Sequence, residues 1–200
     1  MKKRFEELIA ANQSRQNLTP FVSKIMEYVP DMITSIANGT TTAPQGEMVQ
    51  DVMYKLPMYQ YGDYELRLHY VLSSTTTQIH NHTRTMYSLL LGGTYTNTIW
   101  GVIPNDRGAY QQWQRTPNLH NVFKETVNSE GQKMFSDLIV HTSSKRKLLS
   151  VLQIPSGIYH SIKTDSKEPS ISVVIRLPAD KKKADFWVPR GEDLYKEEVP

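Results

Sequence analysis

Short β-branched segments, separated by glycine and proline, run through most of the chain and limit the folds open to it. Residues 64–70 alternate apolar and polar side chains with a period of two, which is typical of a half-buried strand. Further strand-forming segments lie at 88–91, 94–100, 137–142, 148–154, 159–162 and 170–177. Gly92 and Gly93, between 88–91 and 94–100, predict a hairpin there. Several short strands with Gly and Pro turns predict a β-sandwich or barrel.

The segment before these strands has a helical pattern. Apolar residues recur at helical spacing at 5–9 and again at 22–29, and Pro30 is expected to end the second helix. A chain of 200 residues is long enough for one well-buried core. We therefore predict one structural domain: residues 1–45 as a helical extension packed on the barrel, 46–190 as the barrel, and 191–200 as a tail.

Composition excludes several kinds of site. The chain has no cysteine, which rules out disulfides, thiolate metal ligands and cysteine nucleophiles. A net charge of +3 is too small an excess to predict nucleic-acid binding. Charged and amide residues interrupt residues 5–13, and no apolar run is long enough to span a bilayer. These features predict a cytoplasmic protein that binds neither membrane nor nucleic acid.

Three histidines carry the clearest chemical signal. His80 and His82 are separated by one residue, so in an extended segment both imidazoles lie on the same face. His160 follows a Pro-Ser-Gly turn at the end of a predicted strand, where it can supply a third ligand. Imidazole nitrogen is a ligand for several divalent metals, so the residues alone leave iron, zinc, nickel and manganese open. A zinc ion in this site favours hydrolytic or lyase chemistry.

The spacing around these histidines matches both cupin motifs. The first motif has two histidines one residue apart, an acidic ligand and then a glycine, and here it reads His80, His82, Met86 and Gly93. The second, Pro-x-Gly-x-x-His, runs from Pro155 to His160. The resemblance implies a jelly-roll barrel. Met86 stands in the place of the acidic ligand, so three neutral imidazoles hold the metal and leave up to three positions open.

Within the cupins, the chain resembles the cysteine dioxygenases. The segments 79–93 and 154–162 resemble the metal-binding strands of that family, and 168–178 resembles its Glu-Pro turn and following strand. The resemblance covers about 51–177, with a long unmatched stretch at 101–144. It implies a mononuclear Fe(II) ion held by His80, His82 and His160, where a chelated thiol substrate receives both oxygens of O2.

The substrate positions of that family are changed here. Tyr54 stands, by spacing, where the family has a substrate-binding arginine. The family's Ser-x-His-x-Tyr strand corresponds to Ser172, Val174 and Arg176. We expect Tyr54, Met86, Ser172 and Arg176 to contact substrate, and free cysteine as that substrate is in doubt. Two interpretations of Arg176 remain open: it binds the anionic end of a substrate, or it pairs with a carboxylate at the strand end.

The favoured function is a mononuclear non-haem iron dioxygenase or other oxygenase acting with O2 on a small polar molecule, for example a thiol, an anion or an oxygen-chelating substrate. One alternative is a cupin lyase or isomerase that uses zinc or nickel without oxygen. Another is a cupin that binds a small ligand without catalysis. The sequence is compatible with a monomer or a homodimer, and residues 101–144 are compatible with a lid or a dimer contact.

Overall fold

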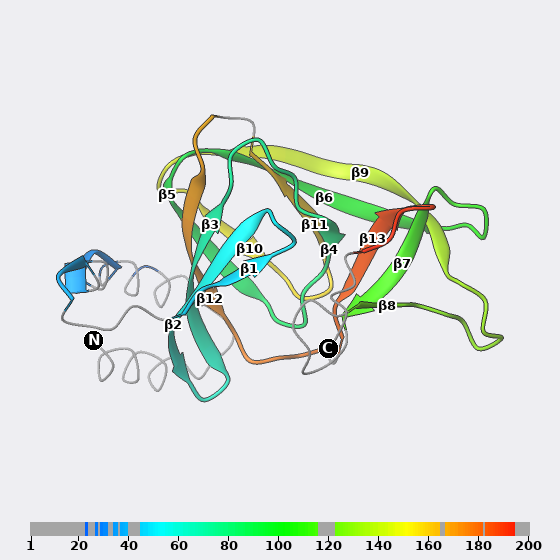
Figure 1. The fold of residues 1–200 in the computed structure, drawn as a ribbon, viewed down its shortest axis with the longest axis horizontal. Coiled ribbons are helices and arrows are strands. Elements are labelled where there is room, and N and C mark those ends of the chain that lie inside the picture. Colours follow the sequence, from blue (N-terminus) through cyan, green and yellow to red (C-terminus); the bar gives the residue numbers. More distant parts are fainter. Residues whose placement is uncertain are drawn as a thin grey trace.

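The structure, a computed structural model, describes residues 23, 27, 29–31, 34–35, 37–39, 45–115, 123–164, 167–181 and 183–194. Two antiparallel sheets face each other and enclose the interior of a barrel (Figure 1). The predicted all-β cupin jelly roll is confirmed. Hydrophobic side chains fill one part of the interior, while the remainder is a cavity lined by both polar and apolar side chains.

The first sheet has six strands in the order β1-β2-β3-β12-β5-β10. Their bounds are Glu47–Val49 for β1, Met53–Tyr61 for β2, Tyr64–Val71 for β3, Ser170–Arg176 for β12, Met86–Gly92 for β5 and Val151–Ile154 for β10. The second sheet has seven strands in the order β13-β4-β11-β6-β9-β7-β8, and β13 also pairs with β7. Their bounds are Asp185–Pro189, Ile79–His80, Tyr159–Lys163, Tyr95–Pro104, Phe135–Arg146, Tyr110–Arg115 and Phe123–Glu125, in that order.

The six-stranded sheet buries apolar side chains on both of its faces. Towards the barrel interior, Leu90 and Val174 belong to a cluster that closes one part of the barrel. On the outer face, Leu66 and Val173 pack with Val29 from the N-terminal helical residues. Val29 is 3% exposed, so the helical segment covers this face of the sheet at that point.

Part of the predicted N-terminal extension lies within the described residues. Ser23, Glu27, Val29, Pro30, Asp31, Thr34, Ser35 and Ala37 are helical. The prediction that the helix ends at Pro30 is wrong, because helical residues continue to Ala37. A turn follows Ala37, and in it the Asn38 amide donates a hydrogen bond of 2.9 Å to the Thr34 carbonyl oxygen. The helix predicted at 5–9 and the end of the tail at 195–200 lie outside the described residues.

The predicted hairpin at Gly92 and Gly93 is wrong, since β5 and β6 belong to different sheets. The chain crosses between the sheets at this point. Gly93 has a φ of +70°, and a Cβ there would lie 2.3 Å from the Pro169 carbonyl oxygen. A close approach to the backbone before β12 therefore requires glycine at this corner.

Residues 101–144 contribute the end of β6 and the strands β7, β8 and β9 to the seven-stranded sheet. Trp113 of β7 is fully buried, whereas Ile139 and Val140 of β9 are 50% and 56% exposed.

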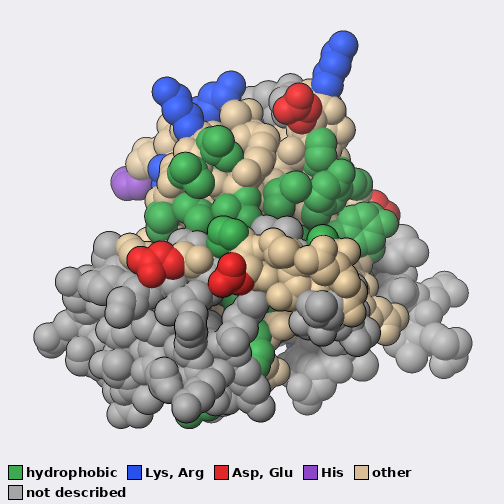
Figure 2. Space-filling model, turned by 90° about the vertical axis from the view of Figure 1, so that its left-hand side faces the viewer, with side chains coloured by type: hydrophobic (Ala, Val, Ile, Leu, Met, Phe, Trp, Pro, Cys, Tyr) green, Lys and Arg blue, Asp and Glu red, His purple; other side chains and the backbone are tan. Residues whose placement is uncertain are grey.

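Figure 2 shows that hydrophobic side chains gather in a band across one face of the molecule. Across the described residues, none of the helices has the length and apolar character needed to cross a bilayer.

Candidate metal centre

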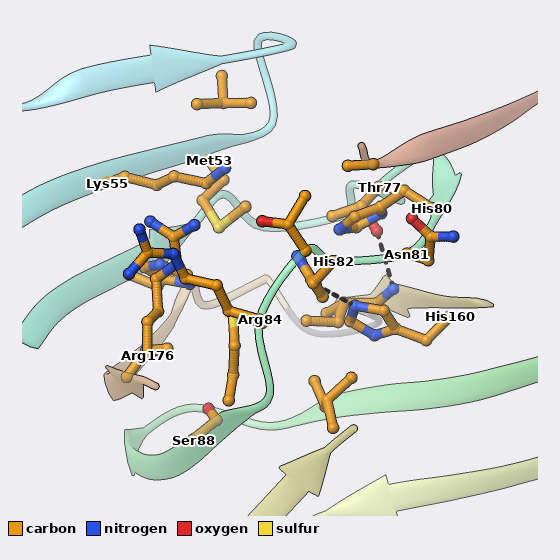
Figure 3. Close-up of a pocket in the computed structure, with 18 of the residues that line it drawn as sticks. Met53, Lys55, Thr77, His80, Asn81, His82, Arg84, Ser88, His160 and Arg176 are labelled. Carbon is orange, nitrogen blue, oxygen red and sulfur yellow. Dashed lines mark hydrogen bonds between the residues drawn. The ribbon is translucent and has the colours of Figure 1, made fainter. Parts of the chain in front are cut away.

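The three predicted metal ligands converge inside the barrel. His80 ends β4, and His160 is the second residue of β11 and lies directly opposite His80 in the antiparallel pairing. β4 ends at His80, so His82 lies beyond the strand and the condition of one extended segment is not met. His82, two residues further, still faces the other two imidazoles (Figure 3).

The spacing of the three rings suits a single ion. Their centroids lie 4.6, 4.7 and 5.0 Å apart, and one nitrogen from each falls within 4.8 Å of the others. The Nε2 atoms of His82 and His160 are 2.8 Å apart. Two nitrogens bound at right angles to one metal, each at about 2.1 Å, lie roughly 3 Å apart. The separation of these two nitrogens is compatible with one shared metal ion, and it is also that of a hydrogen bond.

Hydrogen bonds orient two of the rings. The Nδ1 atom of His160 lies 2.9 Å from Oδ1 of Asn97, a β6 side chain that is only 2% exposed. The Nδ1 atom of His80 lies 2.8 Å from the Gln78 carbonyl oxygen. Both acceptors require a proton on Nδ1, which leaves Nε2 of each ring unprotonated; Nε2 of His160 lies within hydrogen-bond distance of Nε2 of His82. Partners of this kind fix the tautomer of metal-binding histidines.

The electrostatics of the site keep the imidazoles neutral. Burial lowers the pKa of His80 to about 4, opposed by the hydrogen bond to Gln78 and reinforced by Lys55. Burial also lowers the pKa values of His82 and His160 well below the usual value, and the neighbouring imidazoles add to the effect. Neutral imidazole is the form that binds a metal.

A turn connects two of the ligand-bearing segments. Gly157, at the tip of the turn between β10 and β11, has a φ of +75°. Its amide donates a hydrogen bond of 3.0 Å to the carbonyl oxygen of His82. Pro155 accepts a bond from the Ile158 amide and closes the turn. The Pro-x-Gly-x-x-His motif therefore supplies one ligand and also holds the segment that carries another.

The donor set fits a divalent metal with affinity for nitrogen. Among the described residues, these three histidines form the one group of potential ligands close enough to share an ion. Met86, in the position of the acidic cupin ligand, is 5% exposed and faces the same cavity. Three neutral ligands without a carboxylate leave the metal its full charge and open positions.

The histidines open into a cavity of about 530 Å³ whose charged lining is entirely basic among the described residues. A cavity of this size fits a small molecule. Its inner wall, on the six-stranded sheet, carries Lys55, Arg67 and Arg176. Further basic side chains line the cavity at Arg84, Arg115, Lys181 and Lys183. Such a field attracts anions.

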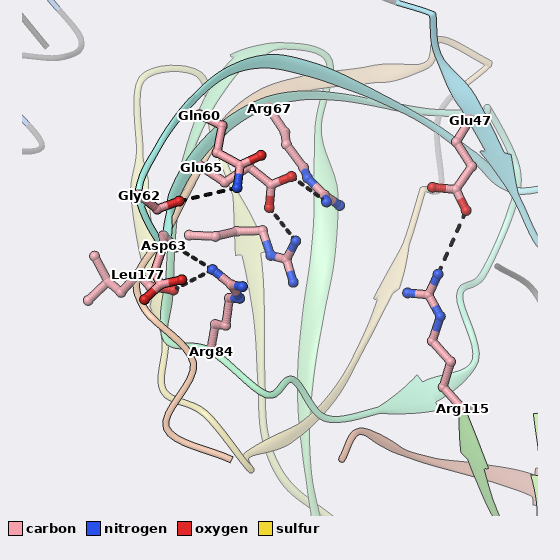
Figure 4. A network of polar contacts seen from close by, with 10 residues as sticks. Glu47, Gln60, Gly62, Asp63, Glu65, Arg67, Arg84, Arg115 and Leu177 are labelled. Carbon is pink, nitrogen blue, oxygen red and sulfur yellow. Dashed lines mark hydrogen bonds and ion pairs between the residues drawn. The ribbon is translucent and has the colours of Figure 1, made fainter. Parts of the chain in front are cut away.

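Two of these arginines share one counter-ion (Figure 4). Glu65 binds Arg67 through Oε1 and Arg176 through Oε2, each at 2.5 Å. Burial alone would raise the pKa of Glu65, but Arg176 and Arg67 lower it below the usual value, so the carboxylate is charged. Both interpretations of Arg176 thus find support in part: it lines the cavity, and it pairs with a carboxylate.

The structure brings three of the four expected substrate residues to the cavity and leaves one out. Met86, Ser172 and Arg176 line it. Tyr54 is 41% exposed on the outer face of β2, where its ring lies 6.5 Å from that of Tyr70. Because alternate residues of a strand face opposite ways, Lys55 lines the cavity in its place. The expected placement of Tyr54 was wrong by one residue.

Sequence reasoning also missed His69. The period-two pattern placed it correctly on the polar face of β3, but that face lines the cavity instead of facing solvent. His69 is 9% exposed, and its Nε2 atom has no hydrogen-bond partner among the described residues. The useful signal was the run of alternating polar side chains Glu65, Arg67 and His69 on one strand. His120 lies outside the described residues, and His141 is exposed on β9.

Neither a protein-family model nor a curated protein sequence matches the chain. Among solved structures, the cupin domain of Cnp3 from Schizosaccharomyces pombe is similar with 13% identity and a TM-score of 0.43, over 68% of this chain and 69% of that one. The DMSP lyase DddQ from Ruegeria pomeroyi has 12% identity and a TM-score of 0.46, over 74% of this chain and 64% of that one.

A third similar structure is the polyketide cyclase RemF from Streptomyces resistomycificus, with 11% identity and a TM-score of 0.38 over 68% of this chain and 69% of that one. Likenesses this distant carry no argument about chemistry. The strand order and the three histidines define a jelly-roll barrel with a potential three-histidine metal centre.

Proposed function

We propose that the protein is a mononuclear metal-dependent oxygenase, with iron(II) as its metal, that acts on a small anionic molecule. The proposal rests on one observation: a cluster of potential metal ligands and a basic wall lie in the same cavity. Three neutral histidines gather at one side, and a basic wall on the opposite sheet faces them across the cavity (Figure 3). A neutral substrate would gain little from such a wall, whereas an anion complements it.

Each group in the cavity has a defined task under this proposal. His80, His82 and His160 hold the metal, and Asn97 keeps the His160 ring in its binding orientation. Iron(II), if bound by these histidines, would supply open positions for substrate and dioxygen. The basic wall binds the anionic end of the substrate and orients the reacting end towards the histidines. Met86 places an apolar surface beside the site.

A second candidate is a metal-dependent lyase or isomerase, which a single observation favours. Burial lowers the pKa of Lys55 to about 7, helped by Arg67 and Arg115 and opposed by Glu47. An amine that exchanges its proton near neutral pH is suited to general acid–base catalysis. Such chemistry needs the metal as an electrophile but does not need oxygen.

Oxygen dependence distinguishes the two candidates. The full chain, reconstituted with Fe(II) without oxygen, is screened against small thiols, carboxylates and hydroxy acids in an oxygen electrode, with product detection by mass spectrometry. The oxygenase proposal expects oxygen uptake in step with product, abolished by His160→Ala and retained by His141→Ala on the exposed surface of β9. Turnover that continues under anaerobic conditions would support the lyase or isomerase instead.

A further inference from the structure

The wall of the cavity opposite the histidines contains polar side chains, two of which have a nitrogen without a hydrogen-bond partner among the described residues. Lys55 of β2, His69 of β3 and Ser172 of β12 lie directly opposite one another in a row across three neighbouring strands. Side chains in such positions have Cβ atoms about 5 Å apart. Arg67 lies two residues from His69 on the same strand and therefore on the same face.

Two buried nitrogen atoms in this group lack partners. Nε2 of His69 and Nε of Arg67 are both buried without a hydrogen bond among the described residues. A buried polar atom left unpaired costs stability, so an acceptor that enters the cavity and pairs with these atoms would gain binding energy. Both side chains line the cavity that the three histidines share.

Basic side chains outnumber carboxylates around this row, which favours binding of an anion. Lys55, Arg67 and Arg176 are three basic groups with one close carboxylate, Glu65, whose two oxygens already bind the two arginines. Glu47 lies near enough to stabilise charged Lys55, but it pairs with Arg115 at 3.8 Å. Together with Glu65, these basic groups thus carry more positive than negative charge in a partly desolvated place.

We infer that Lys55, His69 and the Nε–H group of Arg67 form a subsite for a small oxyanion, such as a carboxylate, sulfonate or phosphonate, at the end of the substrate remote from the metal. The inference rests on the proposed function for the identity of that ligand as substrate. Arg176, paired with Glu65, adds positive potential to the subsite. Lys55 and His69 contact the oxyanion directly.

The lowered pKa of Lys55 agrees with this geometry. Burial and the neighbouring Arg67, Arg115 and Arg176 disfavour its charged form, and Glu47 offsets them only in part. His69 is neutral because burial, Lys55, Arg67 and Arg176 all lower its pKa. A neutral imidazole with its proton on Nε2 donates to an oxyanion without adding charge. An anion bound between them would favour the charged form of Lys55.

The subsite can be tested without the metal. The full chain is stripped of metal on a chelating resin, because a soluble polycarboxylate chelator would compete for the subsite. Propionate, ethanesulfonate and ethylphosphonate are then titrated separately by calorimetry. We expect saturable binding of at least one probe with one equivalent per chain, weakened at least tenfold by Lys55→Met and by His69→Leu. Lys145→Met, which removes an exposed lysine from β9, should leave the affinity unchanged.

A measurement on the unaltered chain keeps the test valid if either variant fails to fold. Reductive methylation is followed by peptide mass spectrometry with and without the bound probe. The subsite predicts that the probe slows methylation of Lys55 and not of Lys145. Absence of saturable binding by all three probes, or equal methylation of Lys55 with and without a bound probe, overturns the inference. Because no metal is present, a failed metal centre leaves this result unaffected.

Discussion

At the scale of single residues, the site depends on which atom of each imidazole is left free. Asn97 is buried on β6, and its Oδ1 atom accepts a hydrogen bond from Nδ1–H of His160. It therefore sets the tautomer of this imidazole without belonging to the three candidate metal ligands. Its role resembles that of the carboxylates and carbonyls that support metal-binding histidines elsewhere. We therefore predict that Asn97 positions the His160 ring and that its loss lowers metal affinity.

Asn97→Ala is expected to weaken metal binding by about 10- to 100-fold, because the His160 ring loses its oriented proton acceptor. The dissociation constant is measured by competition with a chromophoric chelator. Asn97→Asp keeps an oxygen acceptor at the same place and is expected to bind metal within a few-fold of the unaltered chain. Equal affinity in all three proteins would show that the hydrogen bond does not position the ligand.

His69 gives the folded protein a defined sensitivity to acid. Its pKa is held well below the usual value, first by burial and then by Lys55, Arg67 and Arg176. The unfolded chain binds a proton at His69 below about pH 6.5, while the folded chain does not, so stability falls as the pH is lowered through that value.

Protonation of His69 in the unfolded chain is predicted to lower the free energy of unfolding by about 1.4 kcal/mol for each pH unit below roughly pH 6. His69→Leu should remove this part of the slope, so that the free energy of unfolding changes less steeply between pH 7.5 and 5. Urea titrations of metal-free protein at several pH values measure the effect. An identical slope in both proteins would mean that His69 is protonated equally in the folded and unfolded states.

At the scale of elements, strand identity was easier to predict than strand pairing. Period-two alternation found β3 and the β-branched run found β12, because both patterns are local. The pairing of β5 with β10 and β12, and of β6 with β9 and β11, depends on contacts far apart in the chain. A glycine pair between two strands is equally compatible with a hairpin and with a crossing between sheets, so the predicted hairpin failed.

The metal site was predictable for a related reason. His80 and His82 share a short motif, and the Pro-x-Gly-x-x-His turn marks His160 on its own. The substrate wall had no such motif. Placing Lys55 instead of Tyr54 on the inner face depends on a strand register of one residue, and the pairing of Arg176 with Glu65 joins residues 111 positions apart. Neither follows from local pattern.

The corner at Gly93 tests the crossing between the two sheets. Gly93→Ala places a Cβ against the Pro169 carbonyl in addition to the cost of a positive φ. Gly62→Ala is the matched control, since Gly62 has a φ of +54° but no atom within 4 Å of the added Cβ. We expect a loss of about 1–2 kcal/mol for the control and roughly 3 kcal/mol or more for Gly93→Ala, measured by urea unfolding. Similar losses would contradict the close approach at the corner.

At the scale of the whole molecule, the barrel interior contains an apolar cluster that stabilises the fold and a cavity that holds the candidate site. One part holds an apolar cluster that includes Leu90, Ile154 and Val174. The other holds the three histidines and the basic wall, which come from opposite sheets. The net charge is only +3, yet the cavity is basic, because none of the acidic side chains in the described part of the chain lines it.

The account rests most heavily on the metal centre, and metal content tests it directly. The full chain is purified without a histidine tag, and its metals are quantified by elemental analysis before and after anaerobic incubation with Fe(II) and removal of excess. His80→Ala, His160→Ala and the exposed control His141→Ala are treated in the same way. The account predicts about one equivalent of metal in the unaltered chain and the control, and almost none in the other two variants. A folded, unaltered chain that binds no metal after reconstitution would contradict it.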